Sequence, residues 1–179
     1  MSDKVFLRAD DVVRDAFALA HRIYRSGFIP DLLLAVWRGG TPVGIVIHEY
    51  LLYKGIETDH TVVKSVSYSG IGERGEPRLE GLDPVLERLT PASKVLVIDD
   101  IFDSGCTMQA VSTRLKTRTP HVRIATLYHK PACNRTAIQP DYAQRVTDRW
   151  IVFPHELDGL TADEIKAKDS TIYDLLQEG

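Results

Sequence analysis

The chain has 179 residues, of which 44% are hydrophobic, so it is long enough to bury the core of one domain. Its formal net charge of −3 argues against a general nucleic-acid-binding protein, which needs a basic face. No apolar run approaches the length of a membrane-spanning helix, and the first residues lack the apolar centre of a signal peptide. Cys106 and Cys133 are not spaced as a CxxC pair, which favours free thiols and a cytoplasmic location.

A first helix is expected between Asp10 or Asp11, either of which can cap it, and Gly27, a residue type that commonly ends helices. Four residues inside it recur at helical spacing: Val13, Phe17, Ala20 and Tyr24. This stripe predicts a helix that packs one face against the core.

A buried strand is predicted at residues 32–36, and a loop of small and charged residues follows it. The loop residues are Trp37, Arg38, Gly39, Gly40, Thr41 and Pro42. Thr41 can cap the next helix, which is expected to run to about Leu52. Glycines allow a ligand to approach the backbone closely, and Arg38 adds a fixed positive charge. The loop therefore predicts an anion site, with a tight turn and a surface arginine as the alternative.

A long loop without periodicity is expected at residues 67–77, after a strand at residues 60–67. It is rich in glycine and charge. Loops of this length are unusual in compact domains unless they act as lids or are disordered. Both a catalytic lid and a hairpin tip without a role remain open. A short helical turn is expected next, at residues 84–89.

A strand, two acids, a short loop and a helix then follow one another directly. Four apolar residues at 95–98 predict a buried strand of a parallel sheet, which is expected to end at Asp99 and Asp100. The loop at residues 103–107 can turn its backbone N–H groups toward an anion at the start of a helix expected at 108–116. The loop residues are Asp103, Ser104, Gly105, Cys106 and Thr107.

The acidic pair limits which anion this loop can bind. Asp99 and Asp100 would repel a bare phosphate, so they indicate a phosphate that carries a sugar whose hydroxyls need acceptors. The alternative is a strand–loop–helix corner with a solvated acidic pair. The whole stretch resembles the phosphoribosyl-diphosphate (PRPP) motif of the type I phosphoribosyltransferases. The resemblance implies that the two acids hold the ribose hydroxyls and that the loop binds the 5′-phosphate. Ser104 and Cys106 depart from the residues common there, at positions expected to act through backbone N–H groups.

The resemblance extends to the two earlier loops. In this family the loop matching Arg38, Gly39 and Gly40 binds pyrophosphate, and purine-salvage members carry Arg-Gly-Gly or Lys-Gly-Gly there. It implies a cis peptide bond between Trp37 and Arg38. It also implies that the loop containing Tyr68 is the flexible catalytic loop of the 6-oxopurine enzymes.

The rest of the chain continues the alternation of strands and helices. Strands are predicted at residues 122–128 and 145–154. A capping-box pattern at Thr161 and Glu164 predicts one tail helix, and a second is expected at residues 171–177.

This alternation predicts an α/β fold, with a mostly parallel sheet flanked by helices. Ligands of such sheets bind at the carboxyl ends of the strands, where the candidate groups all lie. The resemblance adds a small hood around the base site. A single domain is expected over residues 1–179, with its core at about 30–156 and a helical tail at 161–179.

Lys130 and Trp150 point to a second substrate. A lysine at a strand end can donate to a carbonyl oxygen, and an aromatic ring can stack on a flat base. The stretch around Trp150 and Ile151 resembles the base-binding stretch of the xanthine-guanine and hypoxanthine-guanine enzymes, and Lys130 resembles their O6-binding lysine. Val152 and His155 differ from the bacterial xanthine-guanine enzymes, so acceptance of xanthine stays open.

The implied reaction joins PRPP and a 6-oxopurine to give a nucleoside monophosphate and pyrophosphate. The resemblance implies that Asp103 accepts a proton from N7, Arg38 holds the leaving group, and closure around Tyr68 excludes water. Mg²⁺ is expected largely through PRPP and water, near Asp99 and Asp100. A transferase for another nucleobase and a PRPP-binding regulator without turnover are the alternatives. A homodimer or homotetramer is expected, with no nucleic-acid or membrane partner.

Overall fold

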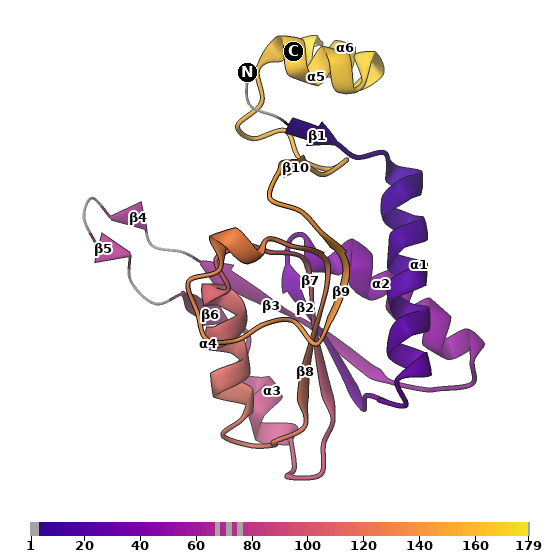
Figure 1. The fold of residues 1–179 in the computed structure, drawn as a ribbon, viewed down its shortest axis with the longest axis vertical. Helices are drawn as coiled ribbons and strands as arrows, with labels where there is room; N and C mark the ends of the chain where they lie inside the picture. The colour runs from indigo at the N-terminus through magenta and orange to yellow at the C-terminus, as the bar shows by residue number, and fades with distance from the viewer. Residues whose placement is uncertain (1–3, 67–68, 71–72, 75–76, 179) are drawn as a thin grey trace. The chain divides into compact units, whose positions relative to one another are not determined.

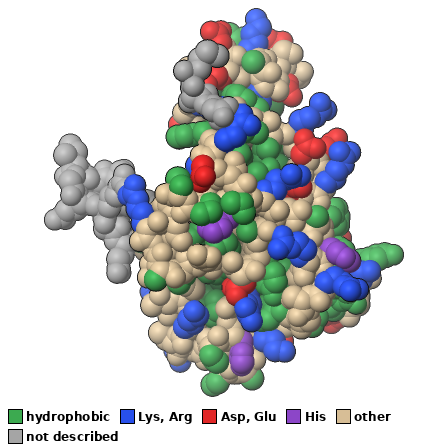
Figure 2. All heavy atoms as spheres, in the orientation of Figure 1, with side chains coloured by type: hydrophobic (Ala, Val, Ile, Leu, Met, Phe, Trp, Pro, Cys, Tyr) green, Lys and Arg blue, Asp and Glu red, His purple; other side chains and the backbone are tan. Residues whose placement is uncertain are grey.

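The computed structural model describes residues 4–66, 69–70, 73–74 and 77–178. The chain forms two compact units, one from the described residues of 1–12 and 149–179 and one from residues 13–148. Within the described part of the chain, no helix is both long and apolar enough to cross a membrane. Figure 2 shows acidic and basic side chains on the same face of the molecule, with hydrophobic side chains between them.

The larger unit is built on a six-stranded sheet with the order β6-β3-β2-β7-β8-β9. Its strands are β2 (Leu32–Trp37), β3 (Asp59–Val66), β6 (Arg78–Glu80), β7 (Val95–Phe102), β8 (Val122–His129) and β9 (Tyr142–Val146). Only β6 pairs in the antiparallel direction; the other neighbours are parallel. The predicted α/β class with a mostly parallel sheet is therefore confirmed.

Helices cover both faces of this sheet (Figure 1). They are α1 (Ala9–Arg25), of which residues 13–25 belong to this unit, α2 (Gly40–Tyr53), α3 (Asp83–Arg88) and α4 (Cys106–Leu115). In Figure 1, α1 and α2 lie on one side of the sheet, and α3 and α4 lie on the other. The central strands are buried from both sides, which explains their continuous apolar sequences.

The sequence predicted that strand β7 ends at Asp99 and Asp100, but the strand is longer. It continues through Asp99 and Asp100 to Phe102, because the neighbouring strand β8 supplies ladder partners over that length. Asp99 lies opposite Thr126, and Phe102 lies opposite His129. The acids are thus held by a regular strand rather than by a loop.

The buried face of α1 also differs from the predicted stripe. Val13 and Phe17 are each 44% exposed, whereas Leu19 and Ile23 are fully buried. Of the four predicted residues, Ala20 is fully buried and Tyr24 is half-buried, so the prediction is right for part of the stripe. The core-facing side is rotated away from Val13 and Phe17 and also includes Asp15. That buried carboxylate forms a two-point ion pair with Arg145 of β9, which satisfies its charge.

Two boundaries near the loops also differ. Helix α2 has Gly39 as its N-cap, and the predicted cap Thr41 lies inside the first turn, where its hydroxyl donates to the Arg38 carbonyl at 2.7 Å. The loop at residues 67–77 contains a short hairpin of β4 (Ser69–Gly70) and β5 (Glu73–Arg74). Tyr68 lies outside the described residues.

The smaller unit contains strands β1 (Lys4–Phe6) and β10 (Trp150–Val152), which pair in parallel, and the tail helices α5 (Ala162–Lys168) and α6 (Ser170–Gln177). The capping box at Thr161 and Glu164 is confirmed. The single strand predicted at residues 145–154 is instead two strands in separate sheets, β9 and β10, because residues 147–149 leave the ladder.

Candidate active site

The glycine loop between β2 and α2 lies directly against the acids of β7. A Cβ atom added to Gly39 would come within 1.9 Å of the Asp100 Oδ2 atom. One added to Gly40 would come within 2.3 Å of the Ile98 carbonyl oxygen. A side chain at position 39 would have to displace the Asp100 carboxylate, and one at position 40 would have to displace the backbone of β7. The structure therefore brings Arg38, Gly39 and Gly40 together with Asp99 and Asp100, and the predicted cis peptide between Trp37 and Arg38 is confirmed.

Asp99 and Asp100 place two carboxylates in a poorly solvated position. Asp100 is 8% exposed, and the Asp99 Oδ1 atom accepts a hydrogen bond from the Asp100 amide at 3.0 Å. Desolvation, and to a lesser extent the neighbouring Asp100 carboxylate, raise the pKa of Asp99 above its usual range. Such a pair favours a ligand that brings hydroxyl donors or a cation.

The candidate phosphate loop, residues 103–107, is held by residues 134–136, which the sequence did not point to. Gly105, with a φ of 77°, caps α4. A Cβ added there would lie 2.6 Å from the Thr136 Oγ1 atom and 2.9 Å from the Asn134 Oδ1 atom. The Arg135 amide donates to the Ser104 carbonyl at 2.9 Å. The segment itself is shaped by Asn134, whose side chain accepts from the Thr136 amide at 2.9 Å.

The loop of residues 103–107 also contacts β3. The Thr107 hydroxyl lies 3.2 Å from the hydroxyl of Ser65, near the end of that strand and just before the long loop of residues 67–77. Asp103 and Cys106 are exposed, and Ser104 is half-buried. All five loop residues therefore lie at the junction of β7 and α4, where backbone N–H groups at a helix start attract anions.

Lys130 and Asp103 both lie near the Cys133 thiol. Lys130 is 9% exposed, and its amide donates to the Phe102 carbonyl at 2.9 Å. A hydrogen bond from the Cys133 thiol to the Asp103 carboxylate raises the pKa of that thiol, and the charge of Lys130 opposes the shift. The structure thus brings a cation and an acceptor together at the carboxyl ends of β7 and β8. Both cysteines are free thiols, as predicted.

His129, the residue before Lys130, is buried and packs edge-to-face on Phe102 with 5.3 Å between ring centroids. Desolvation lowers the pKa of His129. Its Nε2 atom has no hydrogen-bond partner among the residues that the structure describes. We attribute a packing role to this histidine, since its ring contacts the strand end that carries the loop.

Trp150 and Ile151 lie in β10 of the smaller unit. Trp150 is 61% exposed, and Ile151 is buried. Lys130 belongs to the larger unit, so the shared contact of Lys130 and Trp150 with one base stays a prediction.

The acidic pair fits a magnesium ion that arrives with its substrate. Mg²⁺ prefers oxygen ligands and is usually held by one or two carboxylates, with substrate oxygens and water completing its shell. Asp99 and Asp100 supply such carboxylates. Among the described residues there is no group of three or more histidine, cysteine, aspartate or glutamate side chains that could hold a metal ion by themselves.

Comparison with known families shows which family of proteins the chain belongs to. A family model described as a phosphoribosyl transferase domain matches residues 6–158. The chain belongs to the phosphoribosyltransferase family. The predicted family and the enzyme class, a PRPP-dependent glycosyltransferase, are thereby confirmed.

Two relatives are named xanthine-guanine phosphoribosyltransferase. The protein of Cereibacter sphaeroides is 28% identical over 153 residues, which cover 83% of this chain and 84% of that protein. The protein of a Ruegeria species is 28% identical over 160 residues, which cover 83% of this chain and 82% of that protein.

Two solved structures resemble the chain over nearly its full length. A purine phosphoribosyltransferase from Pyrococcus horikoshii matches with a TM-score of 0.72 and 29% identity, over 89% of this chain and 98% of that chain. A hypothetical protein from Neisseria gonorrhoeae with bound ppGpp matches with a TM-score of 0.75 and 26% identity, over 96% of this chain and 98% of that chain.

Proposed function

We propose that this protein transfers the 5-phosphoribosyl group of PRPP to a 6-oxopurine, giving a nucleoside monophosphate and pyrophosphate in purine salvage. The contact of Gly39 with the Asp100 side chain carries the proposal, because it joins the two half-sites that PRPP needs. One half-site offers carboxylates to a ribose, and the other offers backbone and Arg38 to a diphosphate. The relatives named above act on purines, which supports a purine as the acceptor.

In this proposal the chain holds PRPP at three places. Asp99 and Asp100 accept hydrogen bonds from the ribose hydroxyls, and the loop of residues 103–107 donates its backbone N–H groups to the 5′-phosphate. Arg38 and the amides of the glycine loop bind the pyrophosphate. Asp99 and Asp100, with oxygens of PRPP and water, would hold Mg²⁺, which would supply charge neutralisation for the leaving pyrophosphate. Holding both ends of the substrate fixes the ribose carbon at which the bond breaks.

The base is assigned to three residues. The Lys130 ammonium donates to O6, Trp150 stacks on the purine ring, and the backbone at Ile151 contacts the ring edge. Asp103 accepts the proton from N7 as the new bond forms at N9. Tyr68 belongs to the loop proposed to close over the reacting atoms and exclude water.

The decisive assay incubates the purified protein with PRPP and Mg²⁺ and measures pyrophosphate release with each nucleobase. We expect turnover with hypoxanthine, guanine or xanthine and little with adenine, uracil or orotate. Turnover with a pyrimidine alone would favour a transferase for another nucleobase. Tight PRPP binding without turnover on any base would favour a regulator, and either result would overturn the proposal.

A second ligand is suggested by the Neisseria gonorrhoeae structure, which holds ppGpp. Like PRPP, ppGpp is a ribose derivative that carries diphosphate groups, which the two anion-binding loops can hold. One diphosphate occupies the ribose 3′-oxygen, so the acidic pair would meet the 2′-hydroxyl alone. We propose that ppGpp competes with PRPP here. Inhibition that is relieved by raising the PRPP concentration would support this, and inhibition unaffected by PRPP would contradict it. A homodimer or homotetramer, a cytoplasmic location and one domain over residues 1–179 stay predictions.

A further inference from the structure

Helix α5 lies outside the residues that the family model matches, yet it contacts β1, the strand that pairs with β10, and the turn that follows β10. The first contact runs through β1. Lys4 lies opposite Trp150 in the parallel pair of β1 and β10, and its ammonium forms an ion pair with Glu164 of α5 at 2.7 Å. The Lys4 contact lowers the pKa of the Glu164 carboxyl. The helix is thus tied to the strand at the level of the tryptophan.

The second contact lies just beyond β10. The Lys168 ammonium, at the last residue of α5, donates to the carbonyl oxygens of Phe153 at 2.8 Å and Glu156 at 2.5 Å. These carbonyls belong to a turn that is also closed by the Phe153 amide donating to the Glu156 carboxylate at 2.9 Å. Desolvation lowers the pKa of Lys168, as expected for an ammonium taken out of water to bind carbonyls.

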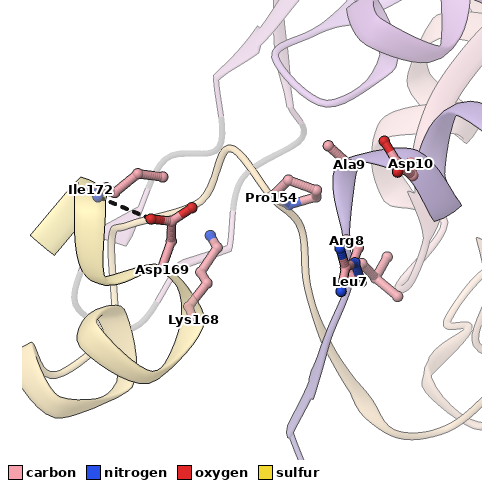
Figure 3. Close-up of a pocket in the computed structure, with 8 residues that line it drawn as sticks. All are labelled: Leu7, Arg8, Ala9, Asp10, Pro154, Lys168, Asp169 and Ile172. Carbon is pink, nitrogen blue, oxygen red and sulfur yellow. Dashed lines mark hydrogen bonds between the residues drawn. The ribbon is translucent and has the colours of Figure 1, made fainter.

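The two contacts come from one side of the helix. Glu164 and Lys168 are four residues apart, so their side chains leave the same face of α5. Figure 3 shows the Lys168 side chain extending from the helix toward the segment with Pro154. Lys168 and Pro154 line a pocket of about 420 Å³, so a replacement side chain at position 168 has room and need not displace the turn by steric clash.

We propose that α5 positions the base-binding segment, residues 150–156, and that Lys168 is the positioning residue that sets the affinity for the purine. The inference rests on the proposed function, which assigns Trp150 and the backbone after it to the base. Stacking and edge contacts depend on where the backbone lies, and the turn after β10 is fixed by a residue of the tail. Lys168 itself does not need to touch the substrate.

The test compares three full-length variants. Lys168→Met removes the ammonium and keeps the stem, and Lys168→Arg restores a donor. Lys166→Met is the matched control, because it removes the same charge from the same helix at a residue whose ammonium faces the Tyr173 ring instead. Lys168→Met is expected to raise the KM for the purine about 3–10-fold, because the segment that contacts the base loses the hydrogen bonds that hold it. The KM for PRPP and the kcat should change less than twofold, Lys168→Arg should recover most of the loss, and Lys166→Met should behave as wild type.

Hydrogen exchange gives a second measurement that does not depend on turnover. In the ligand-free protein, peptides covering residues 150–157 should exchange faster in Lys168→Met than in wild type or Lys166→Met. If the wild type turns over no purine, the proposed function fails, while the exchange data still decide whether α5 holds the segment. Unchanged exchange, or equal rises in KM for purine and PRPP, would overturn the inference.

Discussion

Asp99 is a residue at which binding and stability oppose each other. Its raised pKa means that the folded chain binds this proton more tightly than the unfolded chain does. The free energy of unfolding therefore falls as pH rises from the unfolded value of 3.8 through the raised folded value. The surroundings of Asp99 disfavour its ionised form in the ligand-free protein, and a ribose that donates hydroxyls to the carboxylate would relieve this.

Asp99→Asn should accordingly stabilise the ligand-free protein at pH 8 and weaken PRPP binding. The gain in Tm should shrink as pH is lowered toward 4, because the wild-type carboxyl then becomes neutral as well. The loss in binding should reach about 1.5–3 kcal/mol, the range for a hydrogen bond to a charged group. Thermal melts from pH 4 to 8 and titration calorimetry with PRPP measure both. A lower Tm at pH 8 would contradict the desolvation argument.

Lys130 should discriminate among bases. Lys130→Ala is expected to reduce kcat/KM for hypoxanthine and guanine and to spare the residual activity with adenine, whose 6-amino group cannot accept the lysine hydrogen bond. Steady-state kinetics with each base give the ratio of kcat/KM for hypoxanthine or guanine to kcat/KM for adenine. Lys116→Ala, an exposed lysine at the end of α4, is the control for loss of charge. An equal loss for all bases would remove Lys130 from the O6 contact.

The glycine loop and strand β7 can be tested as interacting elements. Gly39→Ala would push a methyl group into the Asp100 carboxylate, so it should destabilise the protein by about 1–3 kcal/mol, as overpacking does. In an Asp100→Ala background the same substitution should cost less, because the colliding atoms are gone. Chemical denaturation of the four proteins in this double-mutant cycle measures the coupling. Additive effects would mean that the two elements are not in contact.

Helix α1 offers a matched pair of substitutions on opposite faces. Leu19→Ala removes a fully buried side chain and should cost about 2–5 kcal/mol. Phe17→Ala removes a larger side chain that is 44% exposed, and it should cost clearly less. Urea unfolding of both variants checks which face of the helix packs on the sheet. A larger loss from Phe17→Ala would support the stripe expected from the sequence instead.

For the whole molecule, substrate binding should appear as stabilisation. PRPP with Mg²⁺ at 100 times its dissociation constant should add about 2.7 kcal/mol to the free energy of unfolding. EDTA should remove most of this gain, since the metal is expected to bind with the substrate. EDTA alone should leave the Tm unchanged, which differential scanning calorimetry can show. A large drop with EDTA alone would instead indicate a resident structural metal.

The sequence by itself was enough to predict the family, which is confirmed, and to name the residues of the proposed PRPP site. Those features lie in contiguous stretches, where an apolar run, two acids and a loop of small residues follow one another within a strand–loop–helix unit. Local patterns were enough to place these residues at a strand end and a helix start, where anions bind, while the exact end of the strand depended on β8. The cis peptide before Arg38 followed from the family resemblance in the same way.

Only the tertiary structure decided which distant segments meet. Gly39 lies against Asp100, and Asn134 and Thr136 lie against Gly105. These contacts form because the order and register of the strands bring the loops after them to one edge of the six-stranded sheet. Periodicity gives the spacing of a helix but not which of its faces is buried, so the stripe expected on α1 was displaced. The pairing of β1 with β10 and the ion pair of Lys4 with Glu164 likewise join segments far apart in the sequence, which no local pattern specifies.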